Sequence, residues 1–127
     1  MEKQVIRTEN APAPFQGAPY NQAIRAGEFV FVAGQVGTRL GDSGPSGDIA
    51  EQTEHAMRNL GAILVAAGSS LDKLVKTSVF LHDLGDFAAM NEVYAKHVGD
   101  QAPARSTFEV AKLPAGALVE IEAIAHL

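Results

Sequence analysis

Cysteine is absent from this sequence of 127 residues. The absence excludes disulfides, a thiolate nucleophile and a cysteine metal site, and it fits a reducing compartment. A secretory signal is also lacking, because the N-terminus carries the charges of Glu2, Lys3, Arg7 and Glu9 in place of an apolar segment. No later apolar run is long enough to cross a bilayer. We therefore expect a cytoplasmic protein that has no contact with a membrane.

Positive charge is sparse as well. The chain has 10 lysines and arginines and 15 acidic residues, so the formal net charge is -5. The basic residues are scattered along the chain. A nucleic-acid partner is disfavoured, because binding to a phosphate backbone needs clustered positive charge. Metal-ligand spacing is missing too, and we expect no metal and no cofactor. The histidines that lack this spacing are His55, His82, His97 and His126.

Apolar residues make up 46% of the chain and charged residues 20%, which is ordinary for a folded globular protein. The length suits one hydrophobic core, and no linker, internal repeat or low-complexity tract divides the sequence. We expect a single domain over residues 1–127.

Hydrophobic periodicity predicts several strands. The apolar run 29–33 contains aromatic and β-branched residues and predicts a strand buried on both faces, with a short edge strand at 5–7 before it. Repeated glycines and Pro45 make 34–47 a turn-rich connection. Residues 74–81 alternate in polarity and predict another strand.

Two helices are predicted from their start and stop residues. Asp48 followed by Glu51 resembles a capping box, and apolar residues then recur at helical spacing until Gly68. We expect the polar face of this helix to be exposed to solvent while the apolar face covers one side of a sheet. The polar face consists of Gln52, Glu54, His55, Arg58 and Asn59. Asp86 caps a second helix, which Gly99 ends.

The last two predicted strands, 105–111 and 118–126, are joined by turn residues, and we expect them to form a hairpin. Closed with Ala111 near Leu118, this hairpin has one apolar and one charged face, and we expect the charged face opposite the helices. The charged face consists of Arg105, Thr107, Glu109, Glu120 and Glu122, together with the apolar residues Leu118 and Ile124. Such a face is either solvated or buried between subunits, and we favour an oligomer interface.

Several motifs together resemble the Rid/YjgF family, in order and across nearly the whole chain. They are Ala18-Pro19-Tyr20-Asn21-Gln22-Ala23, Ala33-Gly34-Gln35, Val75-Lys76-Thr77-Ser78-Val79-Phe80-Leu81, Asp86-Phe87 with Asn91 and Tyr94, Pro103-Ala104-Arg105-Ser106, Glu109-Val110-Ala111-Lys112-Leu113-Pro114 and Val119-Glu120-Ile121-Glu122-Ala123-Ile124-Ala125. Each motif alone is weak, but the ordered combination is highly specific.

The resemblance implies an α+β, chorismate-mutase-like fold in which a mixed β-sheet carries two helices on one face. It also implies a homotrimer whose sheets form a central barrel, with active clefts between neighbouring subunits. The implied activity is that of an enamine/imine deaminase, a hydrolase acting on C–N bonds other than peptide bonds. The implied substrates are 2-enamino and 2-imino acids (2-aminoacrylate, 2-iminopropanoate and 2-iminobutanoate), and the products are 2-keto acids and ammonia.

The same resemblance implies roles for individual residues. Arg105 is the catalytic anchor of the substrate carboxylate, which a planar guanidinium holds with two parallel hydrogen bonds. Glu120 is the candidate to position and activate the attacking water. Further substrate contacts are implied for Tyr20, Gly34, Asn91 and Thr107. The family often has Ser or Thr at Ala33 and Cys at Thr107, and these two departures leave the arginine anchor in place.

Other interpretations are open at this point. Arg105 could instead be the structural ion-pair partner of Glu120 or Glu122, and Glu120 could be a solvated strand residue. A non-catalytic trimeric protein that binds small carboxylates for regulation would need the same arginine. RNA cleavage, which is attributed to some relatives, is disfavoured by the acidic charge and by the lack of a histidine pair.

Overall fold

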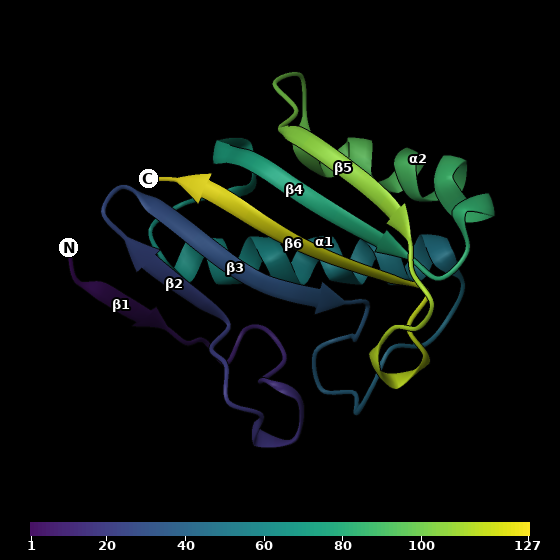
Figure 1. Cartoon of the computed structure of the whole chain (residues 1–127), viewed down its shortest axis with the longest axis horizontal. Helices are drawn as coiled ribbons and strands as arrows, with labels where there is room; N and C mark the ends of the chain where they lie inside the picture. The colour runs from purple at the N-terminus through teal and green to yellow at the C-terminus, as the bar shows by residue number, and fades with distance from the viewer.

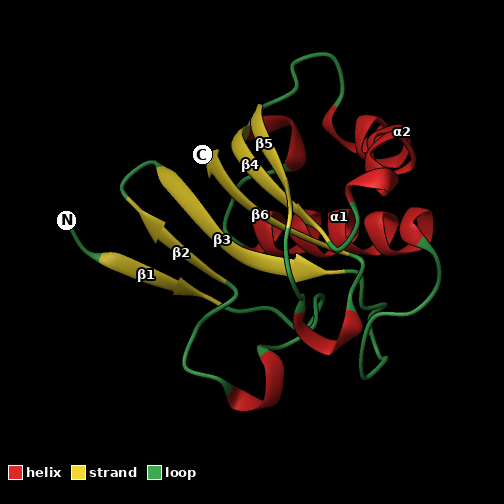
Figure 2. Cartoon of the chain, turned by 45° about the vertical axis from the view of Figure 1, so that its right-hand side comes forward, coloured by secondary structure: helices red, strands yellow, loops and turns green.

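The structure is a computed structural model that describes residues 1–127. A 6-stranded mixed sheet has the order β1-β2-β3-β6-β4-β5, and helices α1 and α2 lie together on one of its faces (Figure 1, Figure 2). The elements are β1 (Lys3–Ile6), β2 (Ala23–Ala26), β3 (Phe29–Val36), α1 (Ile49–Ala66), β4 (Leu74–Leu81), α2 (Phe87–Val98), β5 (Ala104–Glu109) and β6 (Val119–His126). The expected α+β architecture is confirmed. Neither helix combines the length and the apolar character needed to span a membrane.

The hydrophobic core lies between the sheet and the two helices. Alternate side chains of the central strands point into it, among them Val30, Val79 and Ile121, which are all fully buried. Leu60 and Ile63 of α1 contribute from the helix side and are also fully buried. The opposite face of the sheet has no covering element in the single chain (Figure 2).

Strand β3 is longer and more one-sided than the sequence predicts. It runs to Val36, so the turn-rich connection that follows is shorter than expected. Val30 and Val32 are buried, but Phe29 and Phe31 are each 45% exposed. The prediction of a strand buried on both faces is therefore wrong for the single chain, because the phenylalanines point to the face that carries no helix.

Two short strands complete the sheet on the side of β3. Strand β1 covers residues close to the predicted edge strand and pairs antiparallel with β2. Strand β2 is absent from the sequence prediction, because Ala23–Ala26 contains only one β-branched side chain, Ile24. Antiparallel pairing with β3 makes this segment a strand.

Helix α1 begins and ends as its sequence predicts. The Asp48 carboxylate accepts a hydrogen bond from the Glu51 N–H at 2.9 Å. Gly68 follows the helix with a φ of +86°, a conformation that favours glycine. The helix is therefore defined by local signals at both ends.

Two polar side chains of α1, Gln52 and Asn59, are buried, which corrects the expectation that they face solvent. The Asn59 side-chain amide donates to the Thr38 carbonyl at 2.9 Å, and Gln52 Oε1 accepts from the Leu118 N–H at 2.9 Å. Both bonds satisfy backbone groups that the loops leave unpaired. Helix α1 thereby fixes the loop after β3 and the start of β6. The other members of the predicted polar face, Glu54, His55 and Arg58, are half-buried or exposed.

Helix α2 starts where predicted, but the Asp86 side chain makes no capping hydrogen bond. A short 3-10 turn over Leu84–Asp86 leads the chain directly into the helix. Gly99 ends the helix with a φ of +67°. The start of α2 is therefore set by the preceding turn and not by a carboxylate cap.

The predicted hairpin between the last two strands is wrong. Strand β5 pairs with β4 in parallel, and β6 lies between β3 and β4, antiparallel to both (Figure 1). The inward side chains of β6 are at most 4% exposed, so this strand gains most from neighbours on both edges, whereas the less buried β5 forms an edge. Helix α2 supplies the crossover that a parallel pair requires.

Candidate active site

Arg105 lies on the edge strand β5, next to helix α2. The parallel register pairs it with Thr77 of β4, a fully buried residue, so the Arg105 side chain lies on the helix-covered face. The guanidinium carbon is 4.9 Å from the centre of the Tyr94 ring and 5.5 Å from that of the Phe87 ring. Both rings belong to α2, and the face of an aromatic ring attracts a cation. The guanidinium is therefore held by two rings.

This position corrects the expectation that Arg105 shares the face opposite the helices with Glu120. It also argues against a structural ion pair between Arg105 and Glu120 or Glu122 within one chain. The ion pairs of the chain are Arg39–Asp42 and Arg58–Glu54, and His97 is hydrogen-bonded to Glu54. Arg105 is thus a half-buried guanidinium without a carboxylate partner, and its two parallel N–H groups match a carboxylate from a ligand.

Two further predicted residues lie on the same side of the sheet as Arg105. Helical spacing puts Asn91 on the face of α2 that also carries Phe87 and Tyr94. The Asn91 Oδ1 atom is buried and has no hydrogen-bond partner, which is uncommon for a polar atom in a folded protein. Thr107 follows two residues along β5 and points to the same face as Arg105. This edge of the sheet therefore combines a guanidinium, an amide and a hydroxyl group.

Glu120 lies on the other face of the sheet. Its neighbours in β6 point into the core, so its own side chain points to the face without helices, beside Phe80 of β4. The pKa of Glu120 is raised above its ordinary value, mainly because burial removes water from the carboxylate and further because Glu122 is a like charge. A carboxylate with a raised pKa is a stronger proton acceptor, which suits an acid–base role.

Gly34 makes room for the Glu120 carboxylate. The pairing of β3 with β6 is irregular between Val32 and Gln35, and Gly34 lies within this irregularity. A methyl group on Gly34 would come within 2.8 Å of the carboxyl carbon of Glu120. The close approach of the carboxylate to the backbone therefore depends on glycine at this position.

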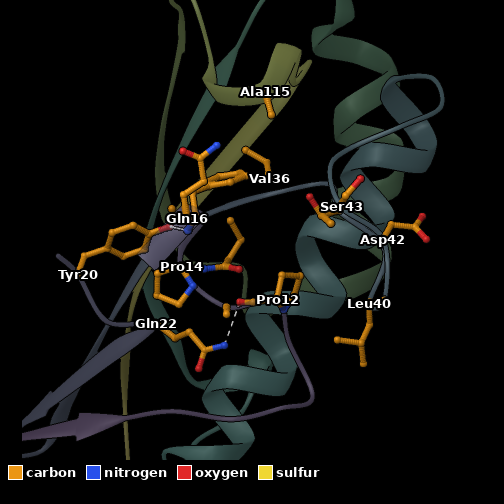
Figure 3. Close-up of a pocket in the computed structure, with 16 residues that line it drawn as sticks. Pro12, Pro14, Gln16, Tyr20, Gln22, Val36, Leu40, Asp42, Ser43 and Ala115 are labelled. Atoms are coloured by element: carbon orange, nitrogen blue, oxygen red, sulfur yellow. Dashed lines mark hydrogen bonds between the residues drawn. The ribbon is translucent and has the colours of Figure 1, made fainter. Parts of the chain in front are cut away.

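Gly34 and Tyr20 line a cavity of about 510 Å³ between the N-terminal segment, the loop after β3 and the turn before β6 (Figure 3). The buried Gln22 amide holds the N-terminal wall by donating to the Pro12 carbonyl at 3.0 Å. Tyr20 is 39% exposed, and its hydroxyl oxygen accepts from the Phe15 N–H at 3.0 Å. The cavity therefore has a hydrogen-bonded wall and adjoins the backbone on which the Glu120 carboxylate rests.

The structure offers few side chains that could bind a metal ion or a phosphate group. No group of three or more histidine, aspartate or glutamate side chains is arranged to hold a metal ion. No lysine, arginine or histidine lines the cavity, so it offers no side-chain cation to a phosphate group. The chemistry of this region comes from neutral polar groups, from the carboxylate of Asp42 in the cavity lining and from that of Glu120 beside Gly34.

A family model described as "Endoribonuclease L-PSP" matches residues 8–127. The chain is a member of this L-PSP family, which is the Rid/YjgF family of the sequence analysis. It is 51% identical over 126 residues to a RutC family protein of Pyrococcus horikoshii, covering 98% of each chain. It is also 42% identical over 125 residues to the 2-iminobutanoate/2-iminopropanoate deaminase of Mus musculus, covering 97% of this chain and 90% of the mouse protein. The crystal structure of E. coli TdcF with bound serine is 37% identical, has a TM-score of 0.89 and covers 98% of both chains.

In this L-PSP family protein the predicted site residues form two groups. The arginine group consists of Arg105, Asn91 and Thr107, on the helix-covered side of the β4–β5 edge. The glutamate group consists of Glu120, Gly34 and Tyr20, of which Glu120 packs against Gly34 and Gly34 shares the cavity with Tyr20. Arg105 and Glu120, the key residue of each group, point to opposite faces of the sheet, so the fold of one chain does not bring these two side chains together.

Sequence patterning does not single out Phe87, Tyr94 or Thr77 as neighbours of Arg105. A usable signal is nevertheless present in this L-PSP family sequence. A strand, a helix and a second strand follow one another between residues 74 and 109, the order typical of a parallel pair with a crossover helix. That order would have predicted Arg105 beneath the helix.

Proposed function

We propose that this L-PSP family protein hydrolyses 2-enamino and 2-imino acids, such as 2-aminoacrylate, 2-iminopropanoate and 2-iminobutanoate, to 2-keto acids and ammonia. The observation that carries the proposal is the Arg105 guanidinium, which rests on two aromatic rings and lacks a carboxylate partner. Every proposed substrate has a carboxylate next to its reacting carbon. Relatives support the proposal, since one is an imino acid deaminase and another binds serine, which carries the same carboxylate.

The opposite orientations of Arg105 and Glu120 support a site between two chains. The two side chains can reach one substrate only if Glu120 comes from a neighbouring chain. The face without helices suits such contact, because Phe29, Phe31 and Phe108 are 45%, 45% and 53% exposed. Association would bury this apolar surface. The proposal therefore includes a homotrimer in which three sheets form a central barrel and the active clefts lie between chains.

In the proposed reaction, Arg105 binds the substrate carboxylate with two parallel hydrogen bonds and fixes the plane of the C=N group. Glu120 accepts a proton from water while the water oxygen bonds to the C=N carbon. This proton then passes to the nitrogen and gives a carbinolamine. The hydroxyl proton of the carbinolamine next passes to the amine nitrogen, the C–N bond breaks as the C=O bond forms, and the 2-keto acid and ammonia leave. An enamine substrate first takes up a proton from water at its terminal carbon and loses one from its nitrogen, which gives the imine. Asn91 supplies an unpartnered oxygen that can accept the substrate N–H.

The test couples the protein to a serine or threonine dehydratase and follows release of the 2-keto acid. We expect the wild-type protein to accelerate release above the spontaneous rate. We expect Arg105→Ala to lose about 100-fold or more in kcat/KM, because the charged hydrogen bonds to the substrate carboxylate are removed. Arg58→Ala is the matched control, since Arg58 is an exposed arginine on α1. Lack of acceleration by the wild-type protein would refute the proposed activity.

A regulatory protein that binds carboxylates without turnover is the second candidate, because it would use the same unpaired Arg105. Calorimetry with pyruvate separates the two functions. Binding that disappears in Arg105→Ala, combined with no turnover of any imino acid, would favour the binding protein. Binding together with turnover supports the enzyme.

A further inference from the structure

The hydroxyl of Tyr94 lies 2.7 Å from the hydroxyl of Thr77, deep beneath Arg105. Tyr94 is 5% exposed and Thr77 is fully buried. Thr77 is the register partner of Arg105 on the neighbouring strand β4, and the Tyr94 ring lies under the guanidinium. Three elements, β4, β5 and α2, therefore meet at one hydroxyl pair and one cation.

We propose that the hydrogen-bonded pair Thr77–Tyr94 is a positioning unit that fixes the plane of the Arg105 guanidinium for carboxylate binding. The inference rests on the proposed role of Arg105 as the carboxylate anchor. Neither Thr77 nor Tyr94 contacts the substrate in this scheme. They act through Arg105 alone.

The need for positioning follows from the setting of Arg105. An arginine side chain has several rotatable bonds, and a carboxylate partner within the chain would normally limit them. Arg105 has no such partner. Without another constraint, substrate binding would have to freeze the side chain, at a cost in affinity. The two aromatic rings hold the guanidinium in advance.

The two rings differ in how firmly they are held. Phe87 is 41% exposed at the start of α2 and has no polar group to anchor its ring. Tyr94 is buried and is attached at its far end to the central strand β4 through Thr77. Burial also raises the pKa of the Tyr94 phenol, so the hydroxyl stays protonated and the pair stays neutral. The Tyr94 ring is therefore the fixed surface and Phe87 the adjustable one.

Stability alone does not explain the hydroxyl pair. Replacing both partners of a buried hydrogen bond by apolar groups of the same shape is often nearly neutral for stability. Val79, two residues along β4, shows that a valine fits the inward positions of this strand. A valine–phenylalanine pair would fill the space of Thr77 and Tyr94 equally well, but it would leave the ring free to shift.

The experiment compares Tyr94→Phe, Thr77→Val and the double variant in two assays, imino acid turnover and calorimetric binding of pyruvate. We expect each single variant to raise KM and the pyruvate Kd by about three- to tenfold, the effect of about one hydrogen bond, and to change kcat less. The double variant should be no worse than either single variant, because the two hydroxyls act as one unit. Thr77→Ser keeps a hydroxyl and should restore near wild-type values.

Three results would overturn the inference. These are unchanged KM and Kd in both single variants, additive losses in the double variant, or a Thr77→Ser protein as impaired as Thr77→Val. Thermal unfolding of each variant separates a loss of fold from a loss of orientation. A wild-type protein that is active while its variants are unaffected refutes only the positioning unit. A wild-type protein that neither binds pyruvate nor turns over imino acids refutes the proposed function as well.

Discussion

The arginine group and the glutamate group hold opposite charges in different ways. Arg105 is kept charged and unpaired on aromatic rings, on the helix-covered side of an edge. Glu120 lies on the side without helices, where burial and the like charge of Glu122 raise its pKa. Each group leaves a charge without its natural counter-charge in the single chain. The comparison fits the proposed site between two chains, in which Arg105 of one chain and Glu120 of its neighbour would serve the same substrate.

The largest expected effect comes from removing Arg105 in one variant and Glu120 in another. Arg105→Ala and Glu120→Gln should each be nearly inactive, but a mixture of the two chains, unfolded and reassembled together, should regain activity. In the proposed homotrimer about one site in four should be restored, because one interface in each mixed trimer would carry both intact residues and about three quarters of the trimers would be mixed. The measurement is imino acid turnover of the reassembled mixture.

The controls are the two variants reassembled separately, which should stay inactive. If the mixture has no more activity than the separate samples, Arg105 and Glu120 do not act together across an interface. Co-purification of untagged Glu120→Gln chains with tagged Arg105→Ala chains verifies that the assemblies have exchanged chains.

A smaller effect is expected from Gly34→Ala. The added methyl group would approach the Glu120 carboxyl carbon to 2.8 Å, so the carboxylate must move. A displacement of about 1 Å at a reacting group can cost up to about 100-fold in rate, and we expect a loss of about 10- to 100-fold. Gly44→Ala is the matched control, because nothing lies within 4 Å of its added methyl group. Equal activity of the two variants would show that the position of Glu120 is unimportant.

The role of Glu120 can also be tested by the pH dependence of activity and of stability. If its carboxylate takes the proton from water, activity rises with pH through the raised pKa, and Glu120→Gln lacks this rise. Stability has the opposite sign. The folded state holds the Glu120 proton at pH values where an unfolded glutamate with a pKa of 4.5 has lost it, so the free energy of unfolding falls as pH increases through this window.

Denaturant titrations of the wild-type protein and of Glu120→Gln at a series of pH values measure the stability effect. A fall of the unfolding free energy that persists unchanged in Glu120→Gln would assign the raised pKa to another group.

The smallest expected effect lies away from both groups. Glu54 of α1 accepts a hydrogen bond from His97 of α2 at 2.8 Å and pairs with Arg58, and the His97 bond is the main cause that lowers the Glu54 pKa. This stability is present above the ordinary glutamate pKa of 4.5 and is lost as pH falls through the lowered pKa. Glu54→Gln should cost about 0.5 to 1 kcal/mol at neutral pH, a value limited by solvent screening.

Thermal unfolding at acid and neutral pH checks this prediction. Glu92→Gln on the exposed side of α2 should change nothing, because Glu92 has no ion pair. A Glu54→Gln protein that is as stable as the wild type at neutral pH would show that the contact between the helices is not stabilising. Imino acid turnover should be unaffected in both variants.

Helix positions were predictable because their signals are local. The Asp48 cap, the glycines after each helix and the apolar spacing between them lie within a few residues of one another. The burial of Gln52 and Asn59 was not predictable, because both side chains form hydrogen bonds to backbone groups of distant loops. Their polarity indicated a surface position, and long-range hydrogen bonding reversed it.

The site residues show the same division. The ordered motifs gave the family and named Arg105, Glu120 and the residues around them, because residue identity is carried by the chain itself. Alternation alone put Arg105 and Glu120 on one face, since a pleat has only two sides and the choice between them depends on which strands pair. In the structure β6 pairs with β3 and β4 and not with β5, and the side chains of Arg105 and Glu120 point to opposite faces.

The sequence by itself determined the two helices with their ends, every strand except β2, the α+β class and the family, because propensity, capping and motif order are local properties. Only the tertiary structure decided the place of β6 between β3 and β4, the rings beneath Arg105 and the glycine gap beside Glu120. These depend on contacts between residues far apart in the chain, which compete for the same strand edges and the same buried space. The outcome of that competition is a global property of the packed molecule.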